Sequence, residues 1–240
     1  MYWWLLLLCP LAYVLGGFNV SKTVTKIRHV DLSRIGSGNA GATNVGRAMG
    51  FKWFLLVTIL ECLKCASIAG LGYVFVSLYT NTFTWYHESH YIVMLSVGAS
   101  AIFGSIFPVW YRFKGGKGLA TWMGLAFVLN PLVMLVVSAI YIPLLAITHI
   151  MSLSTVLGVI TWAILSLSIE APHTAPVIIL YLLCVALIVY SHRKNIVRLV
   201  KGKENKFILK KNVKPTNVIN ADDINTPTVT ALPESTENNQ

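Results

Sequence analysis

Long apolar runs separated by short polar loops dominate this chain. The runs cover residues 2–18, 53–79, 91–110 and 119–190. A helix needs about 20 apolar residues to cross the hydrocarbon core of a bilayer, and every run is near that length or longer. Because lipid offers the backbone no hydrogen bonds, segments that cross it fold as helices that satisfy their own N–H and C=O groups. We therefore predict an all-α, polytopic membrane protein built as a helical bundle.

The placement of charge indicates how this bundle is oriented. Only 12% of the residues are charged and 55% are hydrophobic, whereas soluble domains carry about 25% charged residues. Lys and Arg gather in residues 22–52, 112–117 and 193–214, and the loops at 81–90 and 170–173 contain none. Basic loops of membrane proteins stay in the cytoplasm. The net charge of +10 therefore indicates topology rather than nucleic-acid binding, with the N-terminus outside and the C-terminus in the cytoplasm.

The number of spans depends on the run at 119–190, which begins and ends on the cytoplasmic side and so crosses an even number of times. Pro131, Pro143 and residues 148–154 offer breaks, and residues 170–173 offer a turn outside. At about 20 residues per span, two spans would leave many apolar residues unused. We predict four spans in this run and seven in all, with five as the alternative. The first run lacks the basic region and cleavage site of a signal peptide, so it counts as a span.

Composition divides the chain into two regions. Residues 1–206 are predicted to form one membrane-embedded domain. Residues 207–240 are rich in Asn, Thr and Pro and poor in large apolar residues, which is typical of a disordered tail, here in the cytoplasm. The four cysteines lie in apolar runs, and "CLKC" at 62–65 lacks the further ligands of a metal site. We expect no metal and no cofactor.

The first polar motif, "GSGNAGATNVGR" at 36–47, packs amides and hydroxyls beside an arginine. Glycine permits positive φ and close approach of the backbone to a ligand, and successive N–H groups then form an anion-binding nest. Thr43 or Asn44 is a candidate N-cap for the second membrane helix. A flexible cytoplasmic turn would explain the glycines but not the other side chains. The candidate contacts are Ser37, Asn39, Thr43, Asn44 and Arg47.

The second motif, "FKGGKGLAT" at 113–121, looks like a phosphate loop but fails the nucleotide-binding pattern, since Tyr111 stands in place of its first glycine. Its glycines are expected to leave backbone N–H groups bare, and a helix beginning near Leu119 would aim its own amides at the same anion. Basic residues that merely anchor a helix end would explain the lysines but not three glycines. The candidate contacts are Lys114, Gly115, Gly116, Lys117, Gly118 and Thr121.

The third motif, "HRKNIVRLVKGKE" at 192–204, extends the last span. His192, Asn195 and Arg198 are spaced three apart, which places them near one face of a helix. A basic flank that anchors the span is the alternative. Within the second span, Glu61 and Lys64 are also three apart, and we interpret them as a structural ion pair rather than a substrate contact.

Together the three motifs resemble the bacterial membrane acyl-phosphate:glycerol-3-phosphate acyltransferases, the PlsY family, in order, spacing and cytoplasmic placement, over about residues 10–206. The resemblance implies transfer of an acyl group from acyl phosphate to sn-glycerol 3-phosphate, giving lysophosphatidic acid and phosphate as the first committed step of phospholipid synthesis. It implies an active site on the cytoplasmic face of the inner membrane. It also implies a functional link to the enzyme that makes acyl phosphate from acyl-carrier protein.

The same resemblance implies roles for individual residues. Catalytic roles fall to Ser37, Arg47, Lys117, His192 and Asn195; substrate binding to Asn39, Thr43, Asn44, Lys114, Gly115, Gly116, Gly118 and Thr121; and a structural role to Glu204. Outside the motifs the chain departs from the family pattern, with Ser105 after Gly104 where the family has His, and with Glu61 and Cys65 in its Asp-x-x-Lys-Gly segment.

Two questions stay open at this level. The proton acceptor is either His192 or the phosphate of the substrate itself, and the family is explained by the latter route, which we take as the hypothesis. A transporter of a phosphorylated metabolite would also need amides and cations, but near the membrane midplane on broken helices. The polar motifs here lie at the ends of predicted spans.

Overall fold

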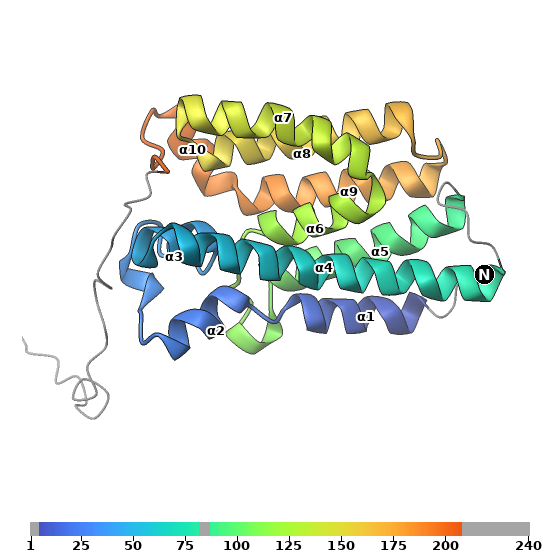
Figure 1. Cartoon of the computed structure of the whole chain (residues 1–240), viewed down its shortest axis with the longest axis horizontal. Coiled ribbons are helices and arrows are strands. Elements are labelled where there is room, and N and C mark those ends of the chain that lie inside the picture. The colour runs from blue at the N-terminus through green and yellow to red at the C-terminus, as the bar shows by residue number, and fades with distance from the viewer. Residues whose placement is uncertain (1–4, 82–86, 208–240) are drawn as a thin grey trace, which may run out of the picture.

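The computed structural model describes residues 5–81 and 87–207, and every element in this part of the chain is a helix (Figure 1). This confirms the predicted all-α fold. The α-helices are α1 (Leu5–Gly16), α2 (Val20–Ile27), α3 (Ala42–Met49), α4 (Phe51–Thr80), α5 (Glu88–Ile106), α6 (Leu119–Leu129), α7 (Pro131–Thr148), α8 (Met151–Ile169), α9 (Ala175–Ser191) and α10 (Arg193–Val200). Two 3-10 turns, η1 (Leu32–Arg34) and η2 (Val109–Tyr111), lie in the connections.

The long apolar run divides into four helices, α6 to α9, as the prediction of seven spans requires. Pro131 opens α7, and the chain turns at 149–150 and at 170–174, close to the predicted breaks. The break predicted at Pro143 is wrong, because this residue lies inside α7. A proline is tolerated within a membrane helix when neighbouring groups satisfy the carbonyl that it frees.

Length and hydropathy support a multi-pass membrane protein. Within the described residues, five helical segments are long and apolar enough to cross a bilayer: Leu7–Ile27, Phe51–Thr80, Glu88–Tyr111, Pro131–Thr148 and Met151–Ile169. A sixth is counted if α9 and α10, bent by 61°, form one broken span, and α6 is a shorter apolar helix. The count of seven spans and the orientation stay predictions.

The long helices run side by side along the long axis of the molecule (Figure 1). α5 lies among α1, α4 and α9, while α7 packs against α8. Trp122, Trp162 and Tyr181 are buried where α6, α8 and α9 meet, with ring centroids 5.9 and 4.8 Å apart. Large apolar side chains such as Leu71 and Leu78 are exposed on the outside of the bundle, where lipid would cover them.

The ion pair predicted in the second span is formed, and because Glu61 also lines the cavity described below, its purely structural role stays a prediction. Lys64 Nζ lies 2.7 Å from Glu61 Oε2 and also donates to the carbonyls of Gly16 and Phe18, at 3.0 and 2.7 Å. Glu61 Oε1 accepts the N–H of Val20 at 2.9 Å. The last C=O groups of α1 and the first N–H groups of α2 have no partner within their own helix. The ion pair therefore supplies hydrogen-bond partners for backbone groups at this junction.

Candidate functional site

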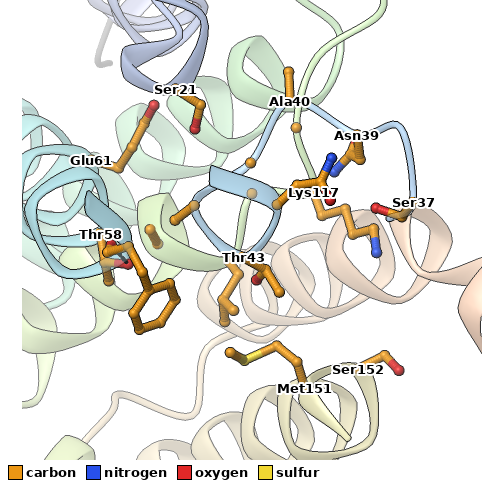
Figure 2. A pocket seen from close by; sticks show the side chains of 18 of the residues that line it. Ser21, Ser37, Asn39, Ala40, Thr43, Thr58, Glu61, Lys117, Met151 and Ser152 are labelled. Atoms are coloured by element: carbon orange, nitrogen blue, oxygen red, sulfur yellow. Dashed lines mark hydrogen bonds between the residues drawn. The ribbon is translucent and has the colours of Figure 1, made fainter. Parts of the chain in front are cut away.

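The three polar motifs meet at one end of the bundle around a cavity of about 500 Å³. Figure 2 shows Lys117 beside Ser37 and Asn39, with Met151 and Ser152 across the cavity. Segments far apart in the sequence thus form one site. The predicted residues that line it are Ser37, Asn39, Thr43, Asn44, Arg47, Gly116, Lys117, Gly118, Thr121, His192, Asn195 and Glu204.

Asn44 holds the first motif in shape. Its side chain is buried, and Nδ2 donates to the carbonyls of Leu32 and Ile35 at 3.1 and 2.8 Å. Gly36 has a φ of +53°, and a Cβ built on it would lie 2.6 Å from Asn44 Oδ1. Glycine is needed here for both conformation and space. The amide hydrogens of Asn44 are therefore occupied by the loop rather than offered to a substrate.

The capping role predicted for Thr43 or Asn44 is wrong. Gly50 precedes the long helix α4, and the extra short helix α3 begins at Ala42 with Gly41 as its N-cap. Both polar residues therefore lie in the first turn of α3. The segment from Gly41 to Thr43 lines the cavity, so the N-terminal end of α3 faces it. The first N–H groups of a helix have no partner within the helix, which makes this end attractive to an anion.

The second motif packs against the end of α5. The N–H of Gly115 donates to the carbonyl of Ile106 at 3.2 Å, and that of Gly116 donates to Ser105 at 2.9 Å. A Cβ on Gly115 would lie 2.3 Å from the Ser105 oxygen. The expectation of bare amides is therefore wrong for these two glycines. They satisfy the last carbonyls of α5, which lack partners within their own helix. The loop and the end of α5 lie so close together that a larger residue than glycine would not fit at position 115.

The free amides of this motif belong instead to the start of α6. Gly118, with a φ of +74°, is the N-cap of this helix, which begins at Leu119 as predicted. Residues 118–121 line the cavity, so the N-terminal turn of α6 faces it. Its N–H groups and the helix dipole favour a negative charge at this place.

Lys117 brings a cation to the same place. Ser191 Oγ donates to its carbonyl at 2.9 Å, which ties the loop to α9. Burial of the ammonium group lowers the pKa of Lys117 to about 8; the charge of Glu204 opposes this effect, and the charges of Arg198 and Arg47 add to it. Within the described residues neither Lys117 nor Arg47 forms an ion pair. Two cations thus face the cavity without a carboxylate partner.

Lys114 and Gly115 lie outside this cavity. They line a neighbouring pocket of about 390 Å³ together with Lys22 and Lys26 of α2. Lys22 Nζ donates to the carbonyl of Lys114 at 3.1 Å and lies 3.8 Å from the ring centre of Tyr111. The two pockets share the segment 39–40 as a common wall.

His192 stands at the bend between α9 and α10 and is only 2% exposed. Its Nδ1 lies 2.8 Å from the carbonyl of Ile188, a distance that requires the proton on Nδ1 and leaves Nε2 as an acceptor. Burial, and next the charge of Lys117, lower the pKa of His192 to about 4. The ring is therefore neutral near pH 7.

Glu204 connects two helices beside the cavity, α8 and α10. It accepts hydrogen bonds from Ser152 Oγ at 2.9 Å, Asn195 Nδ2 at 2.5 Å and Arg198 Nε at 2.8 Å. Burial favours its protonated form, but these three donors outweigh that effect and hold the pKa of Glu204 below its usual value. A structural role, as predicted, fits this geometry.

The other side of the cavity is apolar. Phe51, Phe54 and Leu55 come from α4, and Tyr141, Ile142 and Leu145 come from α7. Sequence patterns could not single these residues out, because five of them lie within continuous apolar runs and Phe51 lies just before one. Asn19 and Ser105 also line the cavity without having been predicted, as does Arg198, whose spacing from Asn195 was the available signal. The cavity therefore joins a cationic end to an apolar cleft.

Comparisons with known proteins agree on one family. The family model for glycerol-3-phosphate acyltransferase matches residues 6–202. The glycerol-3-phosphate acyltransferase of Aquifex aeolicus is 34% identical over 205 residues, covering 84% of this chain and 98% of the relative. That of Mycoplasmopsis pulmonis is 32% identical over 210 residues, covering 82% and 90%.

Solved structures with the same arrangement of helices are also known. Crystal structures of PlsY, an integral membrane glycerol 3-phosphate acyltransferase, were determined in a glycerol 3-phosphate form and a lysophosphatidic acid form. Their TM-scores to this chain are 0.74 and 0.72, at 32% identity. They cover 85% of this chain, and 96% and 95% of their own lengths are matched.

Proposed function

Because the chain belongs to the glycerol-3-phosphate acyltransferase family, we propose that it transfers the acyl group of acyl phosphate to sn-glycerol 3-phosphate, releasing 1-acylglycerol 3-phosphate and inorganic phosphate. The observation that carries the proposal is the dual character of the cavity. Arg47, Lys117 and the start of α6 form a cationic end, and α4 and α7 form an apolar cleft beside it. This combination suits a donor with an anionic head group on an alkyl chain.

The two substrates would reach this cavity from different phases. The acyl donor is a lipid-soluble molecule whose chain fits between helices, while glycerol 3-phosphate is soluble. The Lys and Arg residues of the loops support a location of the cavity at the cytoplasmic face of the inner membrane. The reaction would consume acyl phosphate made from acyl-carrier protein and would begin phospholipid synthesis.

In this reaction the protein has two main tasks, which are to position the substrates and to stabilise negative charge. An acyl phosphate is a mixed anhydride, so its carbonyl carbon is already activated. The C1 hydroxyl oxygen of glycerol 3-phosphate attacks that carbon, the bond from the carbon to the phosphate oxygen breaks, and phosphate leaves with the electron pair. No protein nucleophile takes part. Lys117, Arg47 and the amides of α6 would stabilise the developing negative charge, and the cavity would hold both anions in reach of each other.

The proton of the attacking hydroxyl needs an acceptor. A phosphate monoester has its second pKa at about 6, whereas the pKa of His192 is about 4. The phosphate of the substrate is therefore the stronger base at neutral pH, which supports the substrate-assisted route. His192 Nε2 would accept a hydrogen bond from the other hydroxyl of glycerol 3-phosphate, at C2, and so orient the substrate. Asn195 and Ser37 would contact the substrates from neighbouring positions on the cavity wall.

The test is an acyl-transfer assay on purified protein in detergent, with labelled glycerol 3-phosphate and palmitoyl phosphate, palmitoyl-CoA or acyl-carrier protein as the donor. We expect lysophosphatidic acid from palmitoyl phosphate alone. Arg47→Ala should lose activity, while the matched control Arg34→Ala should keep it, because Arg34 is exposed and pairs only with Asp31. Product from palmitoyl-CoA instead would overturn the donor. No product from any donor, with uptake of glycerol 3-phosphate into sealed proteoliposomes, would favour a transporter.

A further inference from the structure

The chain does not leave the bundle where the family match ends at residue 202. Residues 203–207, which we name the C-terminal strap, turn back from α10 across the end of the α7–α8 pair (Figure 1). The N–H of Lys203 donates to the Arg198 carbonyl at 2.8 Å, and Glu204 is bound to α8 and α10 as described. At its far end the N–H of Phe207 donates to the carbonyl of His149 at 2.6 Å.

Phe207 also contacts the other side of the cavity. Its ring centroid lies 5.1 Å from that of Phe54 on α4, and the ring centroid of Phe51 lies 6.1 Å from that of Phe54. Phe54 lines the cavity, whereas Phe207 does not. Phe207 therefore stands behind a wall residue and joins it, through the strap, to the turn at His149 between α7 and α8.

The helices on either side of the apolar cleft have other main neighbours. α4 packs against α3, α5 and α6, and α7 packs chiefly against α8. Leu55 of α4 and Ile142 of α7 are 44% and 64% exposed, so the cleft faces the outside of the bundle. Phe207 connects α4 to the turn between α7 and α8, so its contacts help to set the distance between the two walls of the cleft.

We propose that Phe207 is a positioning residue for the acyl donor: it holds the Phe54 ring against the apolar cleft and fixes the wall on which the acyl chain lies. This rests on the proposed function, since it concerns the acyl chain of that reaction. The anionic head group is bound elsewhere, at Arg47 and Lys117. Loss of the Phe207 ring therefore weakens binding of a long acyl chain and leaves binding of glycerol 3-phosphate unchanged.

The experiment measures KM and kcat for palmitoyl phosphate, octanoyl phosphate and glycerol 3-phosphate in the full-length protein and in Phe207→Ala. We expect KM for palmitoyl phosphate to rise by about two- to tenfold, the range that an aromatic pair contributes. KM for octanoyl phosphate should change less, because a shorter chain covers less of the cleft, and kcat and KM for glycerol 3-phosphate should stay unchanged. Val200→Ala is the matched control, since Val200 is 83% exposed on α10, next to the strap.

Two further variants keep the test decisive. Phe207→Tyr retains the ring and should restore the KM for palmitoyl phosphate. Phe54→Ala combined with Phe207→Ala should be no worse than Phe54→Ala alone, because residues that act through one contact are not additive. Equal rises in KM for all three substrates, a loss of kcat alone, or no change would overturn the proposal. If the unaltered protein makes no product from any acyl donor, the proposed function fails instead.

Discussion

Asn195 donates from Nδ2 to Oε1 of Glu204 at 2.5 Å, and this bond ties the helix that carries Asn195 to the segment that follows it. The same carboxylate accepts from Ser152 at the start of α8 and from Arg198 on α10. One amide hydrogen of Asn195 is thereby bound to Glu204, which fixes the position of Asn195 on the cavity wall. Glu204, which has no predicted part in the reaction, thus fixes the position of Asn195, which is predicted to take part in it.

Glu204→Gln tests this dependence. The glutamine side chain has one oxygen that accepts hydrogen bonds, and its NH2 group only donates, so it cannot accept from all three donors as the carboxylate does. It also lacks the negative charge that pairs with Arg198. We expect the free energy of unfolding to fall by about 1.5–3 kcal/mol, the range for hydrogen bonds to a charged group. Thermal unfolding followed by tryptophan fluorescence gives the measurement, with exposed Lys203→Gln as the control.

The pH dependence of that difference has a definite sign. The pKa of Glu204 is lowered in the folded protein from an ordinary value of 4.5. Its stabilising contribution is therefore present above that ordinary value and is lost as pH falls through the lower, folded pKa. The gap in unfolding temperature between Glu204→Gln and the unaltered protein should be widest at pH 7 and should narrow below about pH 4. A gap independent of pH would contradict this role.

Gly115→Ala tests the packing of the second motif. The added Cβ would lie 2.3 Å from the Ser105 oxygen and 2.4 Å from Pro108 Cδ, so the loop would have to move away from α5. We expect destabilisation of about 1–3 kcal/mol, as for other overpacked sites. Gly70→Ala on α4 is the matched control, because nothing lies within 4 Å of its Cβ position. Equal stability of the two variants, measured by thermal unfolding, would refute the packing argument.

The sequence predicts this fold well where its signal is the length of an apolar run, as in α4 and α5. It fails where three-dimensional contact decides. The amides of Gly115 and Gly116 look free in a glycine-rich loop, but the end of α5 takes them up. Lys114 and Lys117 look equivalent, yet a left-handed turn at Arg112 and Phe113 and the packing of the loop send them to different pockets.

The boundary of the tail shows the same limit. Composition assigns residue 207 to the tail, since Asn and Thr become frequent after it. Its ring contact with Phe54 joins positions far apart in the sequence, and no local pattern encodes such a contact. The remainder of the predicted tail, residues 208–240, lies outside the described residues.

Lys117→Arg tests the cation at the start of α6. With a pKa of about 8, Lys117 carries its charge at neutral pH and loses it as pH rises above that value. If the charge binds the anionic substrates, kcat/KM should fall above about pH 8 in the unaltered protein, because this ratio reports groups of the free enzyme. Arginine stays protonated to pH 12 or above, so the variant should retain its activity at pH 9. An alkaline limb unchanged by the substitution would show that another group titrates there.

His192→Gln separates the two possible proton acceptors. If the phosphate of glycerol 3-phosphate is the base, the rise of kcat/KM with pH near its pKa of about 6 should persist in the variant. The rate should then fall by only about tenfold, less than the 10²–10⁴-fold of a lost general base. If His192 is the base, the rise disappears together with most of the activity.

A stability measurement on the same variant checks the histidine independently of the reaction. The pKa of His192 is lowered from 6.5 to about 4, so between these values the unfolded chain binds more protons than the folded one. Stability must therefore decrease as pH falls from 6.5 towards 4, because protons favour the state that binds more of them. Glutamine does not titrate, so the unfolding temperature of His192→Gln should fall less than that of the unaltered protein over this interval. If the unfolding temperature fell equally in both proteins, His192 would not be held neutral in the folded state. The argument that His192 is too weak a base would then also be wrong.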